Sequence, residues 1–577
     1  MQKYVFIFCI LTTIFLGCRS THKPVQAEKE PERQVEVPKV EDSKKDAQKN
    51  QEADQLVRIE EVAITTRERK VKNMALDRLQ IMSKSMTAGG EFMSARADIL
   101  PPVLHNTEEY SKINDNVFLS PGTNPLSTFS IDVDAASYAN VRRFLNSGRL
   151  PYKDAVRIEE LINYFNYDYE DPKGEHPFSV MTEVSQAPWN PDHKLVHIGL
   201  QGKKLNYEEM KPSNLVFLVD VSGSMRSPNK LPLLKSAFKL LVKNLDDRDR
   251  IAIVAYAGAA GLVLPSTPAK ERSTILSALD KLEAGGSTAG GAGIKLAYKV
   301  AKENLIEDGN NRVILATDGD FNVGVSSTSE LVRTIEEKRN DGIFLTICGF
   351  GMGNYKDGRM ESISNAGNGN YFYIDNIMEA NKVFVKEMRA TLFTIAKDVK
   401  IQIEFNPAKV QAYRLIGYEN RMLKSEDFND DKKDAGELGA GHTVTALYEI
   451  IPVGVKSDFI KSVDELKYQK GQITNQAGSD ELMTVKLRYK RPKEDTSQLL
   501  SIVIKDKATK LAKSSNNFKF SAAVAEFGML LRDSEFKGQA SYEHALKLAK
   551  EGKGEDLEGY RSEFVQLVKK AALLALN

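Results

Sequence analysis

Several features are scarce in this chain, and each scarcity removes a class of protein from consideration. Its 577 residues include three cysteines, seven histidines and one tryptophan, which leaves little material for a disulfide framework or a histidine-rich metal site. Beyond the amino terminus there is no run of about 18 or more apolar residues, so no internal membrane span is expected. The formal net charge is +1, which provides no overall field that would attract nucleic acid.

The familiar signatures of enzymes are absent as well. The chain has no Gly-x-x-x-x-Gly-Lys-Ser/Thr phosphate loop, no His-Glu-x-x-His, no Gly-x-Ser-x-Gly and no Cys-x-x-Cys. Cys348 lies in the apolar run 343–350 with no histidine near it in sequence, which predicts an inert core thiol. We therefore expect that the protein is not an enzyme.

The amino terminus has the pattern of a bacterial export signal. Lys3 supplies a positive charge, and residues 5–16 form an apolar stretch that is short for a transmembrane helix. Gly17 and Cys18 follow and resemble a lipobox, in which the cysteine is lipidated and becomes the first mature residue. The alternatives are an ordinary signal peptide and a plain buried cysteine. Arg19 stands where inner-membrane lipoproteins often carry aspartate, so we expect a lipid-anchored envelope protein of the outer membrane, facing the periplasm or the outside.

The next segment is too polar to build a core. No Phe, Tyr or Trp occurs between Gly17 and Phe92, and Lys, Glu, Asp, Pro and Gln dominate the first part, which predicts a disordered tether. The length leaves room for about three or four domains. The expected division is a signal peptide at 1–18, the tether at 19–104, an N-terminal helical segment at 105–176, a β-rich region at 177–208 and 396–508, an α/β domain at 209–395 and a helical C-terminal segment at 515–577.

A group of oxygen-bearing side chains follows a strand in the middle of the chain. The apolar run 214–219 does not alternate with polar residues, which predicts a strand buried on both faces. Asp220, Ser222 and Ser224 come directly after it, at the strand end where open α/β sheets usually bind ligands. Their hard oxygens suit Mg²⁺, Mn²⁺ or Ca²⁺ rather than zinc. The alternative is a strand-to-helix turn in which serine and glycine supply only turn chemistry and an N-cap.

Two later segments add oxygens at the same edge of the predicted sheet. A glycine-rich loop contains Thr288 and precedes a helical pattern at 294–303. A second buried strand, at 312–317, is followed by Asp318. With only two carboxylates in the set, a bound divalent ion would keep a coordination position for an acidic ligand.

These three motifs together resemble the von Willebrand factor A (VWA) domain and its metal-ion-dependent adhesion site, over roughly residues 210–394. The resemblance implies a Rossmann-like α/β fold with a doubly wound, mostly parallel sheet. It also implies a Mg²⁺ ion, or Mn²⁺ or Ca²⁺ in its place, completed by an Asp or Glu carboxylate of a protein partner. The implied metal ligands are Asp220, Ser222, Ser224, Thr288 and Asp318.

Strand patterns flank this domain on both sides. The simplest architecture is a β-sandwich into which the VWA domain is inserted, and the alternative is two separate small β regions. The charged, glycine-rich stretch 425–441 predicts an exposed loop. The expected strands cover 178–183, 195–202, 399–405, 443–451, 483–489 and 499–504.

Helical patterns at 518–531, 541–551 and 557–574 predict a tail that packs on the β region; the alternative is a partner-binding groove. Together with the run 129–167, these C-terminal parts resemble the regions flanking the VWA domain in a group of bacterial VWA lipoproteins. Asp132-Val133-Asp134 resembles the start of haloacid-dehalogenase phosphatases, but Ala136 stands where those enzymes carry threonine. The pattern therefore predicts a helix N-cap.

The sequence as a whole predicts a membrane-anchored lipoprotein that binds a protein partner through a metal. One alternative is a structural envelope lipoprotein whose metal only braces the fold. The other is a metal-dependent phosphohydrolase with Asp220 as nucleophile. That chemistry needs a second acid two positions later as proton donor, and Ser222 stands there.

Overall fold

The computed structural model describes residues 108–206, 209–286, 290–319, 328–353, 355–387, 392–460 and 473–576. The signal peptide, Cys18 and the tether lie outside the described residues, and so does Thr288. The described part belongs to a compact unit that spans Pro102–Asn577. None of its helices is both long enough and apolar enough to cross a bilayer.

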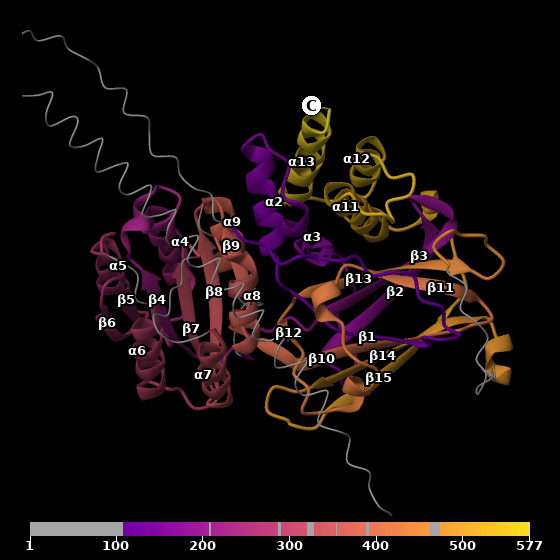
Figure 1. Cartoon of the computed structure of the whole chain (residues 1–577). Coiled ribbons are helices and arrows are strands. Elements are labelled where there is room, and N and C mark those ends of the chain that lie inside the picture. Colours follow the sequence, from indigo (N-terminus) through magenta and orange to yellow (C-terminus); the bar gives the residue numbers. More distant parts are fainter. Residues whose placement is uncertain are drawn as a thin grey trace, which may run out of the picture. The chain divides into compact units, whose positions relative to one another are not determined.

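The VWA segment forms a six-stranded sheet with the order β6-β5-β4-β7-β8-β9, and only β6 runs antiparallel (Figure 1). This confirms the predicted mostly parallel α/β fold. The strands are β4 (Ser213–Asp220), β5 (Arg250–Tyr256), β6 (Ala260–Pro268), β7 (Asn310–Thr317), β8 (Ile343–Phe350) and β9 (Tyr371–Ile374).

Both faces of this sheet are covered by helices, which explains why β4 is apolar throughout. Leu215 and Phe217 pack into one core with α4 and α5, whereas Val216 and Leu218 pack into another with α6, α7 and α8. Cys348 of β8 is fully buried, and burial raises the pKa of its thiol, as expected for an inert core residue. The helices are α4 (Leu231–Asn244), α5 (Arg272–Asp280), α6 (Gly290–Glu303), α7 (Thr328–Asn340), α8 (Asp357–Ala366) and α9 (Ile377–Asn381), with a π turn at Lys382–Lys386.

The flanking strands form two sheets that share one core, so the predicted β-sandwich is confirmed. One sheet has the order β1-β10-β14-β15 with β12 paired to β10, and the other has the order β11-β13-β3-β2. The chain leaves the sandwich after β3 and returns in β10. The strands are β1 (Leu126–Ser130), β2 (Phe178–Ala187), β3 (Asn190–Gly202), β10 (Thr394–Phe405), β11 (Val410–Ile416), β12 (Gly436–Gly439), β13 (Thr443–Pro452), β14 (Glu481–Lys490) and β15 (Gln498–Lys505).

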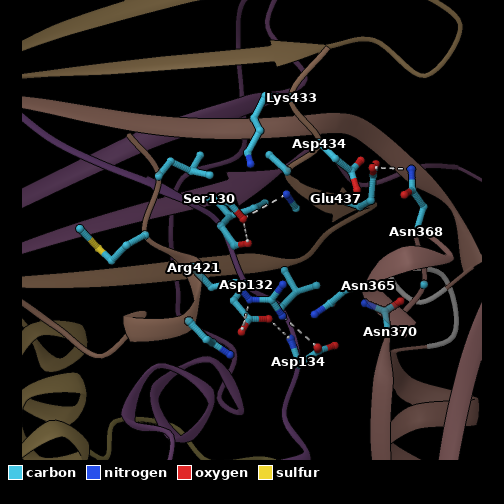
Figure 2. A pocket seen from close by; sticks show the side chains of 18 residues that line it. Ser130, Asp132, Asp134, Asn365, Asn368, Asn370, Arg421, Lys433, Asp434 and Glu437 are labelled. Carbon is cyan, nitrogen blue, oxygen red and sulfur yellow. Dashed lines mark hydrogen bonds and ion pairs between the residues drawn. The ribbon is translucent and has the colours of Figure 1, made fainter. Parts of the chain in front are cut away.

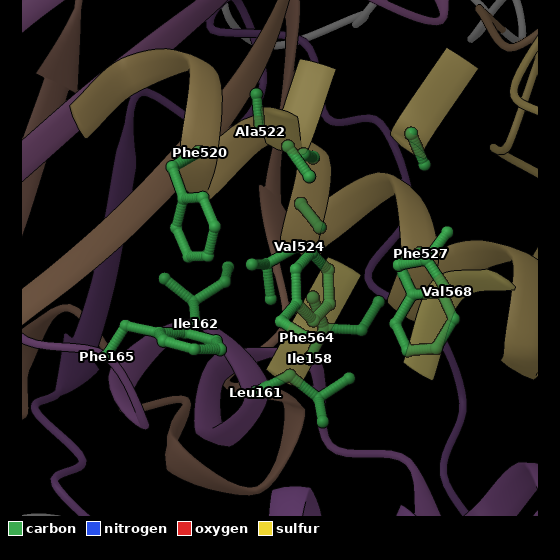
Figure 3. Close-up of a cluster of buried hydrophobic side chains, with 14 of the residues drawn as sticks. Ile158, Leu161, Ile162, Phe165, Phe520, Ala522, Val524, Phe527, Phe564 and Val568 are labelled. Carbon is green, nitrogen blue, oxygen red and sulfur yellow. The ribbon is translucent and has the colours of Figure 1, made fainter. Parts of the chain in front are cut away.

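The C-terminal helices pack as predicted against the β region, and also against two helices that precede the VWA domain. Phe165 lies with its ring centroid 4.8 Å from that of Phe520, in a core that also holds Ile158, Val524 and Phe564 (Figure 3). The helices of this layer are α2 (Ala136–Asn146), α3 (Ile158–Asn163), α11 (Asn516–Arg532), α12 (Tyr542–Glu551) and α13 (Tyr560–Leu574).

Two local predictions were wrong. The stretch 425–441 is not simply an exposed loop, because β12 lies within it and its Leu438 is buried in the sandwich core. Asp132 and Asp134 do not cap α2, whose N-cap is Ala135 without a side-chain hydrogen bond. Both carboxylates instead form ion pairs with Arg421, at 3.0 and 3.3 Å.

Candidate metal site at the carboxyl edge of the VWA sheet

Asp220, the last residue of β4, is completely buried and held in one orientation. Its Oδ1 accepts a hydrogen bond from the backbone amide of Ser222 at 2.9 Å. Its Oδ2 accepts weaker ones from the hydroxyls of Tyr256 at 3.2 Å and Thr317 at 3.3 Å, at the ends of the two neighbouring strands. Burial is the main cause that raises the pKa of Asp220; the hydrogen bonds from Ser222 offset part of it, and Asp318 adds to it. A cation beside this carboxylate would therefore be favourable.

Ser222 and Ser224, in the loop that follows β4, lie together between the buried carboxylate of Asp220 and the surface. The hydroxyl oxygens of Ser222 and Ser224 are 3.1 Å apart. Ser222 is buried, whereas Ser224, in the short 3₁₀ turn Gly223–Arg226, is exposed. The oxygen set thus runs outward from the sheet edge to a position that a partner could reach.

Backbone hydrogen bonds tie this loop to the glycine-rich loop. The amide of Gly223 donates to the carbonyl of Gly286 at 3.0 Å, and that of Gly285 donates to the carbonyl of Val221 at 2.7 Å. Gly286 has φ of +82°, a conformation that favours glycine. These bonds bring residue 286 against the site, but Thr288 itself lies outside the described residues, so its role stays a prediction.

Asp318 follows β7 and carries a partner that sequence reasoning missed. Its Oδ2 accepts a hydrogen bond from the ammonium group of Lys230 at 2.8 Å, and both side chains are buried. The stem of Lys230 lies against Gly351, where any Cβ would overlap with it. Nothing in the local sequence around Lys230 indicates this contact, because the two residues are 88 positions apart.

The donor set fits a hard divalent cation. Asp220, Ser222, Ser224 and Asp318 offer only oxygen, and two buried carboxylates balance the charge of one such ion. Within the described ranges, no group of three Asp, Glu, His or Cys side chains is placed to hold a metal. A metal at this edge of the sheet would therefore depend on the serine hydroxyls as well as the carboxylates.

Comparison with known proteins identifies the domains of the chain. The family described as von Willebrand factor type A domain matches residues 214–386. Residues 390–574 match the family described as Uncharacterized protein YfbK, C-terminal, and residues 104–197 match the one described as von Willebrand factor. Uncharacterized protein YfbK of Escherichia coli (strain K12) is 44% identical over 473 residues, which cover 81% of each chain.

The chain belongs to the YfbK family. It is a VWA-domain protein whose YfbK-type C-terminal domain corresponds to β10 through α13. Uncharacterized protein sll0103 of Synechocystis sp. is 28% identical over 190 residues, or 33% of this chain and 44% of that one. The solved structure entitled "von Willebrand factor type A from Catenulispora acidiphila" is 15% identical, with a TM-score of 0.39 over 70% of this chain and 92% of the other.

Proposed function

We propose that this YfbK-family protein binds a protein partner through a divalent metal ion held by its VWA domain. Asp220, Ser222, Ser224, Thr288 and Asp318 would hold the ion, with Mg²⁺ as the expected metal. A bound ion would supply a Lewis-acidic position that accepts a carboxylate oxygen. We also propose that Cys18 carries a lipid that anchors the protein in the bacterial cell envelope, at the outer membrane.

The observation that carries this proposal is the gradient from the buried Asp220 to the exposed Ser224. A site that only braced the fold would have no need for an exposed hydroxyl at its rim. Two carboxylates neutralise a divalent ion, and the ammonium of Lys230 adds one further positive charge. The complete site would thus attract an anionic group, such as an Asp or Glu side chain of a partner.

The structure does not favour the phosphohydrolase alternative. Ser222 occupies the position two residues after Asp220, where that chemistry would need a proton-donating acid. The other hydrogen-bond partners of Asp220 are Tyr256 and Thr317, and burial holds the pKa of Tyr256 well above its usual value. No side chain among these three is suited to protonate a leaving group near neutral pH.

The test is capture of a partner from envelope extract with Mg²⁺ or with EDTA present. A protein should be retained only with Mg²⁺, and the double variant Ser222→Ala, Ser224→Ala should lose it. Ser227→Ala, which removes an exposed hydroxyl of the same loop, is the matched control. Phosphate release should be assayed in parallel with a panel of phosphoesters. Release that disappears in Asp220→Asn would refute the adhesion proposal in favour of the enzyme.

A further inference from the structure

The flanking parts of the chain contact the VWA domain at both edges of its sheet. At the amino edge, the amide of Asn368, which precedes β9, donates a hydrogen bond to Glu437 of β12 at 2.9 Å (Figure 2). The backbone amide of Tyr371, the first residue of β9, likewise donates to Asp134 at 2.9 Å. At the carboxyl edge, where the candidate metal site lies, residues 108–109 contact the loop that connects β8 to α8. This second contact is the one that bears on the site.

Glu108 is the centre of the contact at the carboxyl edge. Its side chain is 2% exposed and forms a bidentate ion pair with Arg143 of α2, at 2.9 and 3.0 Å. Its Oε1 also accepts a hydrogen bond from the backbone amide of Gly353, in the loop after β8, at 3.0 Å. Burial acts to raise the pKa of Glu108, but Arg143 and the amide of Gly353 together hold it below its usual value. A charged, buried carboxylate therefore ties this loop to α2.

Further hydrogen bonds fix the same loop on either side of this ion pair. The amide of Glu109 donates to the carbonyl of Tyr355 at 3.0 Å, and the amide of Asp357 donates to the carbonyl of Glu109 at 3.2 Å. From β9, the hydroxyl of Tyr373 donates to the carbonyl of Gly351. The loop is thus held at its beginning, in its middle and at its end. We call the contacts of residues 108–109 with this loop the clamp.

The clamped loop packs directly against two parts of the candidate metal site. Any Cβ on Gly351 would overlap the stem of Lys230, so the lysine lies against the backbone of the loop. A Cβ on Gly319, the residue after Asp318, would come within 2.7 Å of the Cα of Tyr355. The loop therefore confines the stem of Lys230, whose ammonium lies 2.8 Å from the carboxylate of Asp318.

The ammonium of Lys230 and a divalent ion would compete for the same carboxylate. Asp318 is one of the two carboxylates that the expected ion needs, and in the structure it already has a cationic partner. A bound ion either shifts Lys230 away from Asp318 or leaves two positive centres side by side in a buried place, where charges repel strongly. A contact that keeps Lys230 on Asp318 therefore weakens metal binding.

We propose that the clamp is an autoinhibitory contact. With the clamp closed, the loop keeps Lys230 on Asp318, and release of the clamp lets the lysine move and the divalent ion bind. This inference rests on the metal-dependent function proposed above. The coupling is reciprocal, because a clamp that opposes the ion must itself be loosened by the ion, with the same free energy.

The test measures Mg²⁺ affinity by titration calorimetry in the unchanged protein, in Glu108→Gln, in Lys230→Met and in the double variant. Glu108→Gln keeps the shape of the side chain but removes its charge, and it should raise Mg²⁺ affinity by about fivefold or more. In the Lys230→Met background the same change should alter affinity by less than about twofold, because the lysine that the clamp confines is gone. Glu109→Gln is the matched control and should leave affinity unchanged, because its side chain is 74% exposed and exposed ion pairs contribute little.

Hydrogen exchange provides a second readout, which does not depend on the affinity of any variant. The amide of Gly353 donates to Glu108 and that of Glu109 donates to Tyr355, so the exchange of these two amides reports on the clamp. Saturating Mg²⁺ should make both exchange faster in the unchanged protein. Exchange that is equal or slower with Mg²⁺ bound would overturn the proposal.

Equal Mg²⁺ affinity of Glu108→Gln and the unchanged protein would refute the clamp and leave the metal site in place. So would an equal gain in affinity with and without Lys230, because the effect would then not pass through the lysine. If Glu108→Gln does not fold, Tyr373→Phe takes its place with the same expectation, since it removes only the hydroxyl that holds Gly351. Absence of Mg²⁺ binding in every form, Lys230→Met included, would instead refute the metal site itself, and the clamp with it.

Discussion

Lys230 is the built-in cation of the candidate metal site, and its removal should have opposite effects on stability and on metal binding. In Lys230→Met the hydrocarbon stem is largely kept, while the ammonium that lies 2.8 Å from Asp318 is lost. Both partners are buried, at 8% and 0% exposure of their side chains, so Asp318 would be left without that counter-charge. Breaking such a buried pair costs about 3–5 kcal/mol, and we expect the metal-free protein to be destabilised by an amount of this order.

A divalent ion would then replace the missing charge. Metal affinity should therefore rise in Lys230→Met. If the bound ion restored only about 1.4 kcal/mol of the lost stability, the metal would bind tenfold more tightly. Chemical unfolding in EDTA measures the first effect, and titration calorimetry with Mg²⁺ or Mn²⁺ measures the second. Lys243→Met, an exposed change on α4, is the control. Unchanged stability in EDTA together with unchanged or weaker metal affinity would refute the reasoning.

Three further predictions concern other residues. Asp220→Ala should abolish metal binding in calorimetry, while the circular dichroism spectrum stays native because the hydrophobic core of the sheet does not depend on Asp220. Equal metal affinity in this variant and in the unchanged protein would argue against the site. Cys18→Ser should move the protein from the membrane fraction to the soluble fraction, because the substitution removes the proposed site of lipid attachment and stable anchoring needs more than one acyl chain. Unchanged fractionation would contradict a lipid anchor. The contribution of Glu159 to stability should fall as the pH rises from about 5 to 8. Burial, mainly, raises the pKa of Glu159 to about 8 in the folded state, whereas its usual value is 4.5. Glu159 is then protonated when folded and ionised when unfolded, and its contribution lowers stability by about 1.4 kcal/mol per pH unit in that window. In Glu159→Gln the fall measured by urea unfolding should be shallower, and an identical pH profile would count against a neutral, buried Glu159.

The α/β domain was readable from sequence because burial on two faces leaves a distinct pattern. The uninterrupted apolar run of β4 has that form, and its alternate residues do enter two different cores. The flanking strands were readable where apolar and polar residues alternate, as in β10. The C-terminal helices were readable from their periodicity, but the core that they share with α3 was not predicted.

The contacts that the sequence did not predict involve residues that lie far apart along the chain. β1 is rich in serine and threonine, and its Ser127 is buried because its hydroxyl lies 2.8 Å from that of Tyr448. Asp132 and Asp134 are locally ideal for a helix N-cap, and only the fold shows that Arg421 binds them instead. The ion pair of Lys230 with Asp318 is of the same kind. Sequence indicates which oxygens come to the strand ends, but not which cation meets them.

The most direct measurement for the central claim is a crystal structure with Mn²⁺, in which anomalous scattering locates the ion. We expect one strong peak within coordination distance of the hydroxyls of Ser222 and Ser224, with Asp220 and Asp318 around it and Thr288 completing the protein ligands. A coordination position should face outward beside Ser224 and be filled by water or by a carboxylate of a neighbouring molecule. Absence of a peak there at millimolar Mn²⁺, with Lys230 still paired to Asp318, would contradict a metal-dependent adhesion site in this protein.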